Sequence, residues 1–232
     1  ARAAKVSNPR TPKQQEQRGK FATAFSFLKA IKPFIRIGYK ELTQDKSAFN
    51  SAMSYTLKRA VTGSGKEIKI DFDRALVSMG TLMPIFEGAA TVSNHQMTFN
   101  WKDNSGMGNA ERTDIVMVLV YNKDREAAVY DTEAALRSDC HAGLQLPEDW
   151  QDDELVAYLS FYSTDGNCVA NSICLPISVI EIPEEEIDVQ TESIDTTHKR
   201  ILPDKRKVHQ SRITVHSLSA PPNEIRTYRC ET

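Results

Sequence analysis

The sequence has few cysteines, 4 in 232 residues, and none of them stands in a Cys-x-x-Cys pair. Zinc sites of the common classes and secreted disulfide frameworks need such regular spacings, so the sequence predicts neither. Long apolar runs are also missing. The longest extends from Ile115 to Tyr121, whereas a membrane-spanning helix needs about 20 apolar residues. No apolar segment follows the basic start of the chain. We therefore expect no signal peptide and a cytoplasmic or particle-associated location.

Familiar catalytic patterns are absent as well. The sequence contains no Gly-x-Ser-x-Gly and no readable Ser-His-Asp arrangement. Residues 62–66 resemble the end of a phosphate-binding loop but lack its leading glycine. An acidic cluster surrounds Trp150. It has no apolar neighbours that would raise the pKa of one carboxyl group and so fit it for general acid–base catalysis. We expect this cluster to be an exposed turn whose charge could pair with the basic arm of another copy. The sequence thus predicts a protein that is not an enzyme and has no cofactor or small-molecule substrate.

Charge is strongly segregated, although the formal net charge is only −2. Residues 1–40 hold ten basic residues and one acid, residues 181–195 hold seven acids and no base, and residues 199–212 are basic again. Such blocks are typical of surfaces that bind partners of opposite charge. The predicted contacts to nucleic acid or an acidic partner are Arg2, Lys5, Arg10, Lys13, Arg18 and Lys20, and those to a basic partner are Glu184, Glu185, Glu186 and Asp188. A solvated helix face with a loose arm is the alternative, because no aromatic residue is interleaved among the basic residues of the arm.

The first 65 residues predict two helices. Residues 11–14 combine an N-cap threonine, a proline at the first helical position and a glutamine three residues after the cap, so a helix should extend from residue 12 to about residue 32. Its predicted apolar stripe is Phe21, Phe25, Leu28 and Ile31. Pro33 should end or kink this helix and lead into a short apolar linker. A second helix is expected over residues 46–61. We expect the aromatic residues Phe21, Phe25 and Phe34 to belong to the core.

Short strands are predicted from residue 67 onward, where the apolar period changes to two. Seven candidates between turn signals are residues 89–93, 96–102, 113–122, 127–131, 141–146, 155–163 and 168–176. Seven strands in this length are typical of an immunoglobulin- or fibronectin type III-like sandwich, with Trp101 as its central aromatic. The predicted fold class is α+β, mainly β. It has four parts: a basic extended arm (1–10), a helical hairpin (11–65), a seven-stranded antiparallel sandwich (66–176) and an extended acidic and basic C-terminal arm (177–232).

One glycine-containing loop, residues 103–109, is rich in side-chain oxygens. A calcium site needs about six or more oxygen ligands. Asp103, Ser105, Asn109 and Asp114 could supply a few of them, but the alternation and closing glutamate of a helix–loop–helix calcium loop are missing. We therefore expect a long hairpin loop and no metal, with these four residues as weak metal candidates only.

Three stretches resemble a family of uncharacterised proteins from Bacteroidota. They are residues 7–18 with the motif Asn-Pro-Arg-Thr-Pro and the helix to Tyr39, residues 99–114 with Phe-Asn-Trp-Lys-Asp-Asn-Ser-Gly, and residues 146–161. The resemblance covers residues 5–176 and implies no activity, because the family has none established. Its N-terminal motif is also similar to one in small proteins of tailed-phage and prophage gene sets. Members usually end near the last sandwich strand, whereas this chain continues to residue 232.

These patterns favour a non-enzymatic structural or assembly protein, a building block of a virion, phage-like particle or surface assembly. Its oppositely charged arms would dock on neighbouring copies or on other subunits. One alternative is a nucleic-acid-binding module that uses the basic arm. Another is a carbohydrate- or protein-binding sandwich that uses the loops at residues 103–109 and 165–166.

Overall fold

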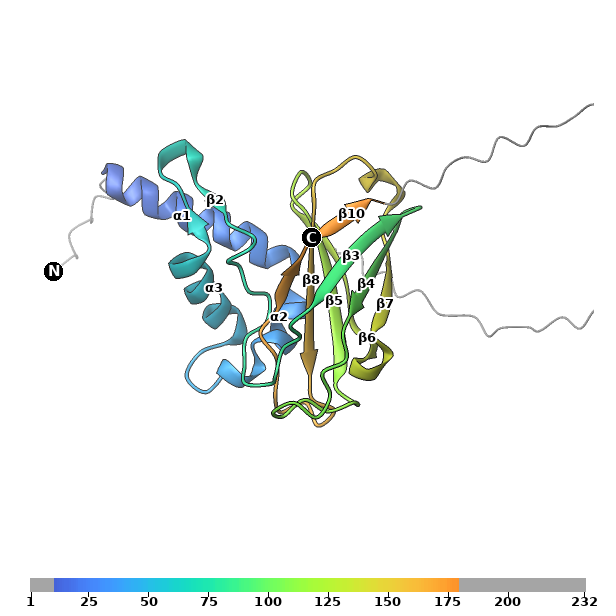
Figure 1. Cartoon of the computed structure of the whole chain (residues 1–232). Helices are drawn as coiled ribbons and strands as arrows, with labels where there is room; N and C mark the ends of the chain where they lie inside the picture. Colours follow the sequence, from blue (N-terminus) through green and yellow to red (C-terminus); the bar gives the residue numbers. More distant parts are fainter. Residues whose placement is uncertain (1–10, 180–232) are drawn as a thin grey trace, which may run out of the picture. The chain divides into compact units, whose positions relative to one another are not determined.

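The computed structural model of the chain describes residues 11–179. These residues form three helices and ten strands in three sheets (Figure 1), which confirms a mixed α+β fold. The predicted basic arm and most of the predicted C-terminal arm lie outside the described residues. The predicted contact residues among them are Arg2, Lys5, Arg10, Glu184, Glu185, Glu186 and Asp188.

Helix α1 (Pro12–Ala30) begins where the sequence predicts. The Thr11 side chain accepts a hydrogen bond from the backbone N–H of Gln14 at 3.4 Å, and Pro12 occupies the first turn, where no backbone donor is needed. The buried face of the helix includes Phe27, which lies outside the predicted stripe. Phe21 and Phe25 are 51% and 43% exposed, so the prediction that they belong to the core is wrong. The face that the helix turns toward the sheet is the one that carries Phe27.

Pro33 does not lead into a linker. It stands in the first turn of a second helix, α2 (Lys32–Gly38), a position that proline tolerates. Gly38 ends this helix against residues 71–87, which lie between the second and third strands, so close that a Cβ atom would lie 2.5 Å from the carbonyl oxygen of Val77. A 3₁₀ turn, η1 (Lys40–Leu42), leads to α3 (Ala48–Arg59), within the predicted range. The predicted hairpin is therefore a layer of three helices, α1, α2 and α3, called the helical layer below.

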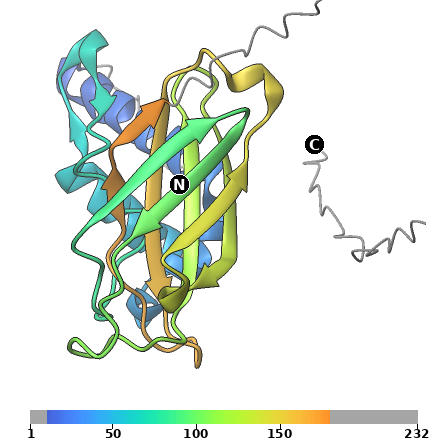
Figure 2. The same ribbon diagram turned by 45° about the vertical axis from the view of Figure 1, so that its right-hand side comes forward.

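The strands form one small and two larger sheets. Strands β1 (Val61–Thr62) and β2 (Lys69–Ile70) pair around the turn η2 (Gly65–Glu67). The first large sheet has the order β10-β3-β4-β7 and the second β6-β5-β8-β9. Figure 2 shows the first sheet in front of the second, with the helices behind. The bounds are β3 (Gly88–Ser93), β4 (Gln96–Trp101), β5 (Ile115–Asn122), β6 (Ala127–Leu136), β7 (His141–Gln145), β8 (Leu155–Tyr162), β9 (Ile173–Leu175) and β10 (Ile177–Val179), with turns η3 (Arg137–Asp139) and η4 (Glu148–Trp150) on either side of β7.

The seven predicted strands correspond to β3 to β9, but the described sandwich has an eighth strand. β10 pairs in parallel with β3, with Ile177 opposite Ala90 and Val179 opposite Val92. The prediction of seven strands in a purely antiparallel sandwich is therefore wrong, and the last strand lies beyond residue 176. The sequence-based prediction ends the sandwich at Pro176, so Ile177 and Val179 fall into the predicted C-terminal arm.

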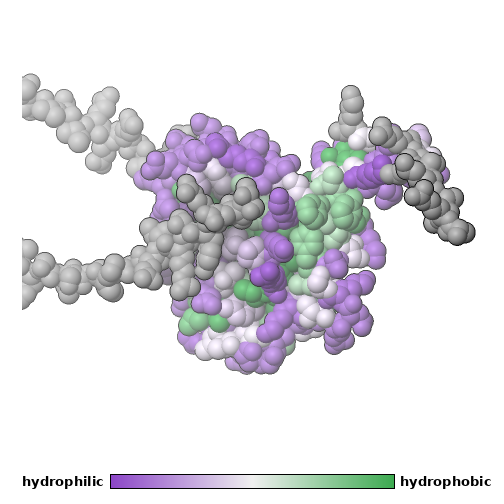
Figure 3. Space-filling view, turned by 180° about the vertical axis from the view of Figure 1, so that it is seen from behind, coloured by the Kyte–Doolittle hydropathy of each residue, from purple (hydrophilic) through white to green (hydrophobic). Residues whose placement is uncertain are grey.

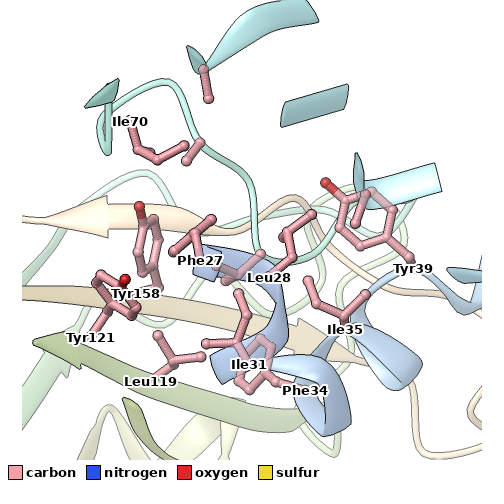
Figure 4. Packing of buried hydrophobic residues seen from close by; sticks show 14 of the residues in the cluster. Phe27, Leu28, Ile31, Phe34, Ile35, Tyr39, Ile70, Leu119, Tyr121 and Tyr158 are labelled. Atoms are coloured by element: carbon pink, nitrogen blue, oxygen red, sulfur yellow. The ribbon is translucent and has the colours of Figure 1, made fainter. Parts of the chain in front are cut away.

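The second sheet is covered on both faces, and its central strands β5 and β8 are almost entirely buried. The inner side of β5, which includes Val118, packs against the first sheet around Trp101, as predicted for this tryptophan. On the outer side, Leu119 and Tyr121 pack against the helical layer (Figure 4), and the Tyr121 ring meets the Phe27 ring edge to face at 5.0 Å. Because β5 is apolar on both faces, it is the longest apolar run in the sequence.

Candidate functional site

A fully buried arginine holds one end of the sandwich together. Arg137 directly follows β6, and its Nε donates to the Asp114 carboxylate at 2.9 Å. Its other nitrogens donate to the side-chain oxygen of Asn104 at 2.6 Å and to the Met83 carbonyl at 2.8 Å. The guanidinium lies over the Phe161 ring, 4.0 Å from its centroid. Burial lowers the pKa of Arg137, and the charge of Asp114 opposes this shift. Since each polar group has a partner, the cluster is a structural anchor.

The four metal candidates do not converge. Asp114 belongs to this buried ion pair. Asp103 accepts hydrogen bonds from the hydroxyl and the backbone N–H of Ser105, and these bonds lower the pKa of the Asp103 carboxyl. The Asn109 side chain bonds to the backbone of residues 81–83. Within residues 11–179, no group of three histidine, cysteine, aspartate or glutamate side chains is placed to hold a metal ion. The side-chain oxygens of this loop serve to hold its own backbone and that of the neighbouring segment.

The two loops proposed for carbohydrate or protein binding meet at the same end of the sandwich. Asn109 and Asp165 line a pocket of about 260 Å³ between them. Asp165 accepts hydrogen bonds from Ser163 and Asn167, which lower the pKa of its carboxyl. The acidic group of this pocket is therefore held within its own turn.

A cleft of about 950 Å³ is lined by residues of α1, of the segment around β2 and of the strand ends of the second sheet. Phe72 and Tyr121 form part of its wall, and Cys174 lies beside Asp73. Burial, with the nearby carboxylate of Asp73, raises the pKa of Cys174 to about 12. Burial together with Glu126 raises the pKa of Tyr121 to about 12. The thiol is therefore protonated near neutral pH and is a poor nucleophile.

Three of the six predicted basic contact residues lie within the described part, all on α1. Lys13 and Arg18 are exposed. Lys20 is partly buried and pairs with Glu16 one turn earlier, at 2.8 Å. The structure thus places these three on a single helix of the outer layer.

A larger division of charge separates the helical layer from the strands. Residues 11–60, which hold the three helices, contain ten basic and three acidic residues. Residues 61–179, which hold all ten strands, contain eighteen acidic and eight basic residues. The helical layer covers the outer face of the second sheet, and the first sheet lies on the other side of that sheet (Figure 1). The segment that holds the helices is therefore net basic, and the segment that holds the strands is net acidic.

Two exposed phenylalanines, Phe21 and Phe25, and the partly buried Phe49 form a patch on the helical layer, called the aromatic patch below. The rings of Phe21 and Phe25 stack with centroids 6.2 Å apart, and Phe25 meets Phe49 of α3 edge to face at 5.8 Å. Arg18 and Lys29, each one turn along α1 from this pair, are also exposed. Figure 3 shows an apolar area over the helical layer on this side. Exposed apolar patches of this kind are typical of interaction surfaces.

A groove of about 600 Å³ lies at one end of the sandwich and is called the end groove below. Its apolar lining includes Leu146, Trp150, Leu155 and Val179. Asp153 and Glu154 of the predicted acidic cluster also line it. The other two members, Asp149 and Asp152, are exposed close by in the sequence, as is Glu148, which the prediction did not include.

Part of this acidic rim is paired. Arg125 pairs with Asp149 and Asp153, and Lys123 pairs with Glu154. Hydrogen bonds from Asn122 and Arg125 lower the pKa of Asp153. Five acids against two bases leave the rim negative, as the sequence predicted for this turn.

Comparison with known proteins finds one family. A family described as "Family of unknown function (DUF6266)" matches residues 1–176, and residues 177–232 lie outside the match. No curated protein and no solved structure matches. None of the helices in residues 11–179 is both long enough and apolar enough to span a membrane.

Proposed function

Because the chain belongs to this family of unknown function, we propose its function from its surfaces: it is a non-enzymatic assembly protein whose copies associate head to tail. The observation that supports this function is the division between a basic helical segment, residues 11–60, and an acidic segment, residues 61–179, whose acids lie almost all in the connections between its strands. Opposite charges on two sides of one molecule orient neighbouring copies in the same direction. Such heterologous contacts build rings or filaments. A virion, phage-like particle or surface assembly is the setting that we propose.

We also propose that the sandwich is related to fibronectin type III domains. In the constant-type immunoglobulin arrangement, the fourth strand joins the sheet of the first, second and fifth strands. In residues 88–175 the fourth strand, β6, pairs with β5 in the other sheet, and only β3, β4 and β7 stay together. This order favours the fibronectin-like arrangement.

Sedimentation velocity of the purified chain tests the assembly function. We expect oligomers at about 0.1 M salt, where the Debye length is ~10 Å, and dissociation at about 1 M salt, where it is ~3 Å. Negative-stain electron microscopy of the low-salt sample should then show rings or filaments. Monomers of 26.0 kDa at every salt and protein concentration would contradict self-assembly.

Nucleic-acid binding is a second candidate, favoured by the aromatic patch. Phe21 and Phe25 stand between the exposed cations Arg18 and Lys29, and aromatic rings beside cations are what single-strand-binding proteins use to stack bases. Fluorescence anisotropy with labelled single-stranded DNA measures this. We expect the affinity to fall steeply with salt if phosphates are bound. Absence of binding at the lowest salt would reject this candidate.

A further inference from the structure

We propose that the aromatic patch of one copy docks in the end groove of the next copy. This inference rests on the proposed function, since it names the two surfaces through which copies associate. The aromatic patch exposes apolar rings beside cations, and the end groove exposes an apolar lining beside acids.

The aromatic patch has apolar rings that are exposed and cations beside them. Phe21 and Phe25 leave 51% and 43% of their surfaces in solvent. Their stacking and the contact with Phe49 fix their orientation, so little side-chain freedom is lost when they are buried. Large aromatic side chains held in this way are typical anchors of protein interfaces.

The end groove is an apolar hollow with a negatively charged rim. Its lining includes Trp150 and Leu155, and its volume of about 600 Å³ lies within the range of roughly 300–1,000 Å³ that is usual for binding pockets. Val179 lines the groove and is 73% exposed. Its rim is negative, because Lys123 and Arg125 neutralise only part of the five rim acids.

The signs of the charges decide how two copies meet. Two aromatic patches facing each other would bring Arg18 and Lys29 of both copies together, and two end grooves would bring their acidic rims together. Patch against groove places cations opposite acids and rings opposite an apolar lining. The contact is therefore heterologous, and a pair of copies keeps one free groove on one copy and one free patch on the other for further neighbours.

Two variants that each disable one surface test the contact. The first is Phe21→Ser with Phe25→Ser, which removes exposed rings only. The second is Val179→Arg, which puts a cation into the groove. The matched controls are Leu42→Ser and Met107→Arg, changes of the same kind at exposed apolar residues that belong to neither surface. Circular dichroism checks that all four variants fold.

We expect each surface variant to raise the dissociation constant for self-association by about 30-fold or more and the controls to leave it unchanged. An equimolar mixture of the two surface variants should form a 1:1 dimer and nothing larger. One variant keeps its groove and the other keeps its patch, so a single contact remains possible. Sedimentation velocity at low salt measures both quantities.

The other outcomes separate the two proposals. If the wild type associates but the mixed variants stay monomeric, the docking contact is wrong and self-assembly stands. If Val179→Arg associates like the wild type, the aromatic patch does not dock in the end groove, and the proposed contact is again wrong. If the wild type is monomeric throughout, self-assembly itself is wrong. Loss of single-stranded DNA binding in the phenylalanine variant would in that case assign the patch to nucleic acid.

Discussion

Removing Asp114 should destabilise the protein strongly, because it leaves a buried cation without its counter-charge. Arg137 is 0% exposed and Asp114 is 1% exposed, so water cannot replace the lost carboxylate. In Asp114→Ala, the Nε donor of Arg137 also loses its acceptor at 2.9 Å. Breaking a buried ion pair from one side costs about 3–5 kcal/mol. Since domains have total stabilities of about 5–15 kcal/mol, this variant should lose a large share of its free energy of unfolding.

Urea unfolding followed by tryptophan fluorescence measures this loss. Trp101 is a suitable probe, because its indole N–H donates to the backbone carbonyl of Arg137 at 2.8 Å. For a chain of this size, about 2–4 °C of Tm corresponds to 1 kcal/mol, so Tm should fall by roughly 6–20 °C.

The double variant Arg137→Met with Asp114→Leu is the control, since it removes both charges and keeps an apolar volume. It should be more stable than Asp114→Ala, because no unpaired charge remains buried. It should stay below the wild type, because Asn104 and the Met83 carbonyl lose a donor. A loss under about 1 kcal/mol for Asp114→Ala, or a double variant no more stable than the single one, would refute this reasoning.

Three further changes test other parts of the structure. Gly38→Ala should lower the free energy of unfolding by about 1–3 kcal/mol, because the new Cβ would lie 2.5 Å from the Val77 carbonyl oxygen. Thermal unfolding measures this loss, and an unchanged Tm would contradict it. With its pKa raised to about 12 by burial, Cys174 should be alkylated at pH 8 about a thousandfold more slowly than an ordinary thiol; peptide mass spectrometry measures the rate, and urea should restore it. Hydrogen bonds from Asn122 and Arg125 lower the folded pKa of Asp153, so the contribution of Asp153 to stability is complete above its unfolded pKa of about 4 and is lost as the pH falls through the lower folded pKa. The variant Asp153→Asn should therefore make the free energy of unfolding less dependent on pH in this acid range. An unchanged pH profile would count against the pairing.

Features that depend on neighbouring residues could be predicted from the sequence. The N-cap at Thr11, the alternation in β4 and the apolar run of β5 are local patterns, and each is where the sequence places it. The buried face of α1 could not be predicted in this way. Phe21 stands seven residues before Leu28 and Phe27 four residues before Ile31, so each shares a helical face with a residue of the predicted stripe. The sheet against which the helix packs decides between them.

The candidate sites depend even more on distant residues. Arg137 bonds to partners 23, 33 and 54 residues away and stands in no motif, so nothing in the sequence marked it as buried. The end groove combines residues of the β3–β4 turn, the segment from Leu146 to Leu155, and β10. Only its acidic cluster was visible in the sequence, because the acids are consecutive or nearly so.

The double-sided burial of β5 has a consequence for how the protein is made. While it is unshielded, a strand whose residues are nearly all apolar is prone to aggregate. The helices that cover its outer face lie earlier in the chain and are built from local contacts, so during translation they emerge before the strand they protect. We therefore expect the helical layer to shield this strand as it emerges. We expect loss of the helices to lower the yield of newly made soluble protein.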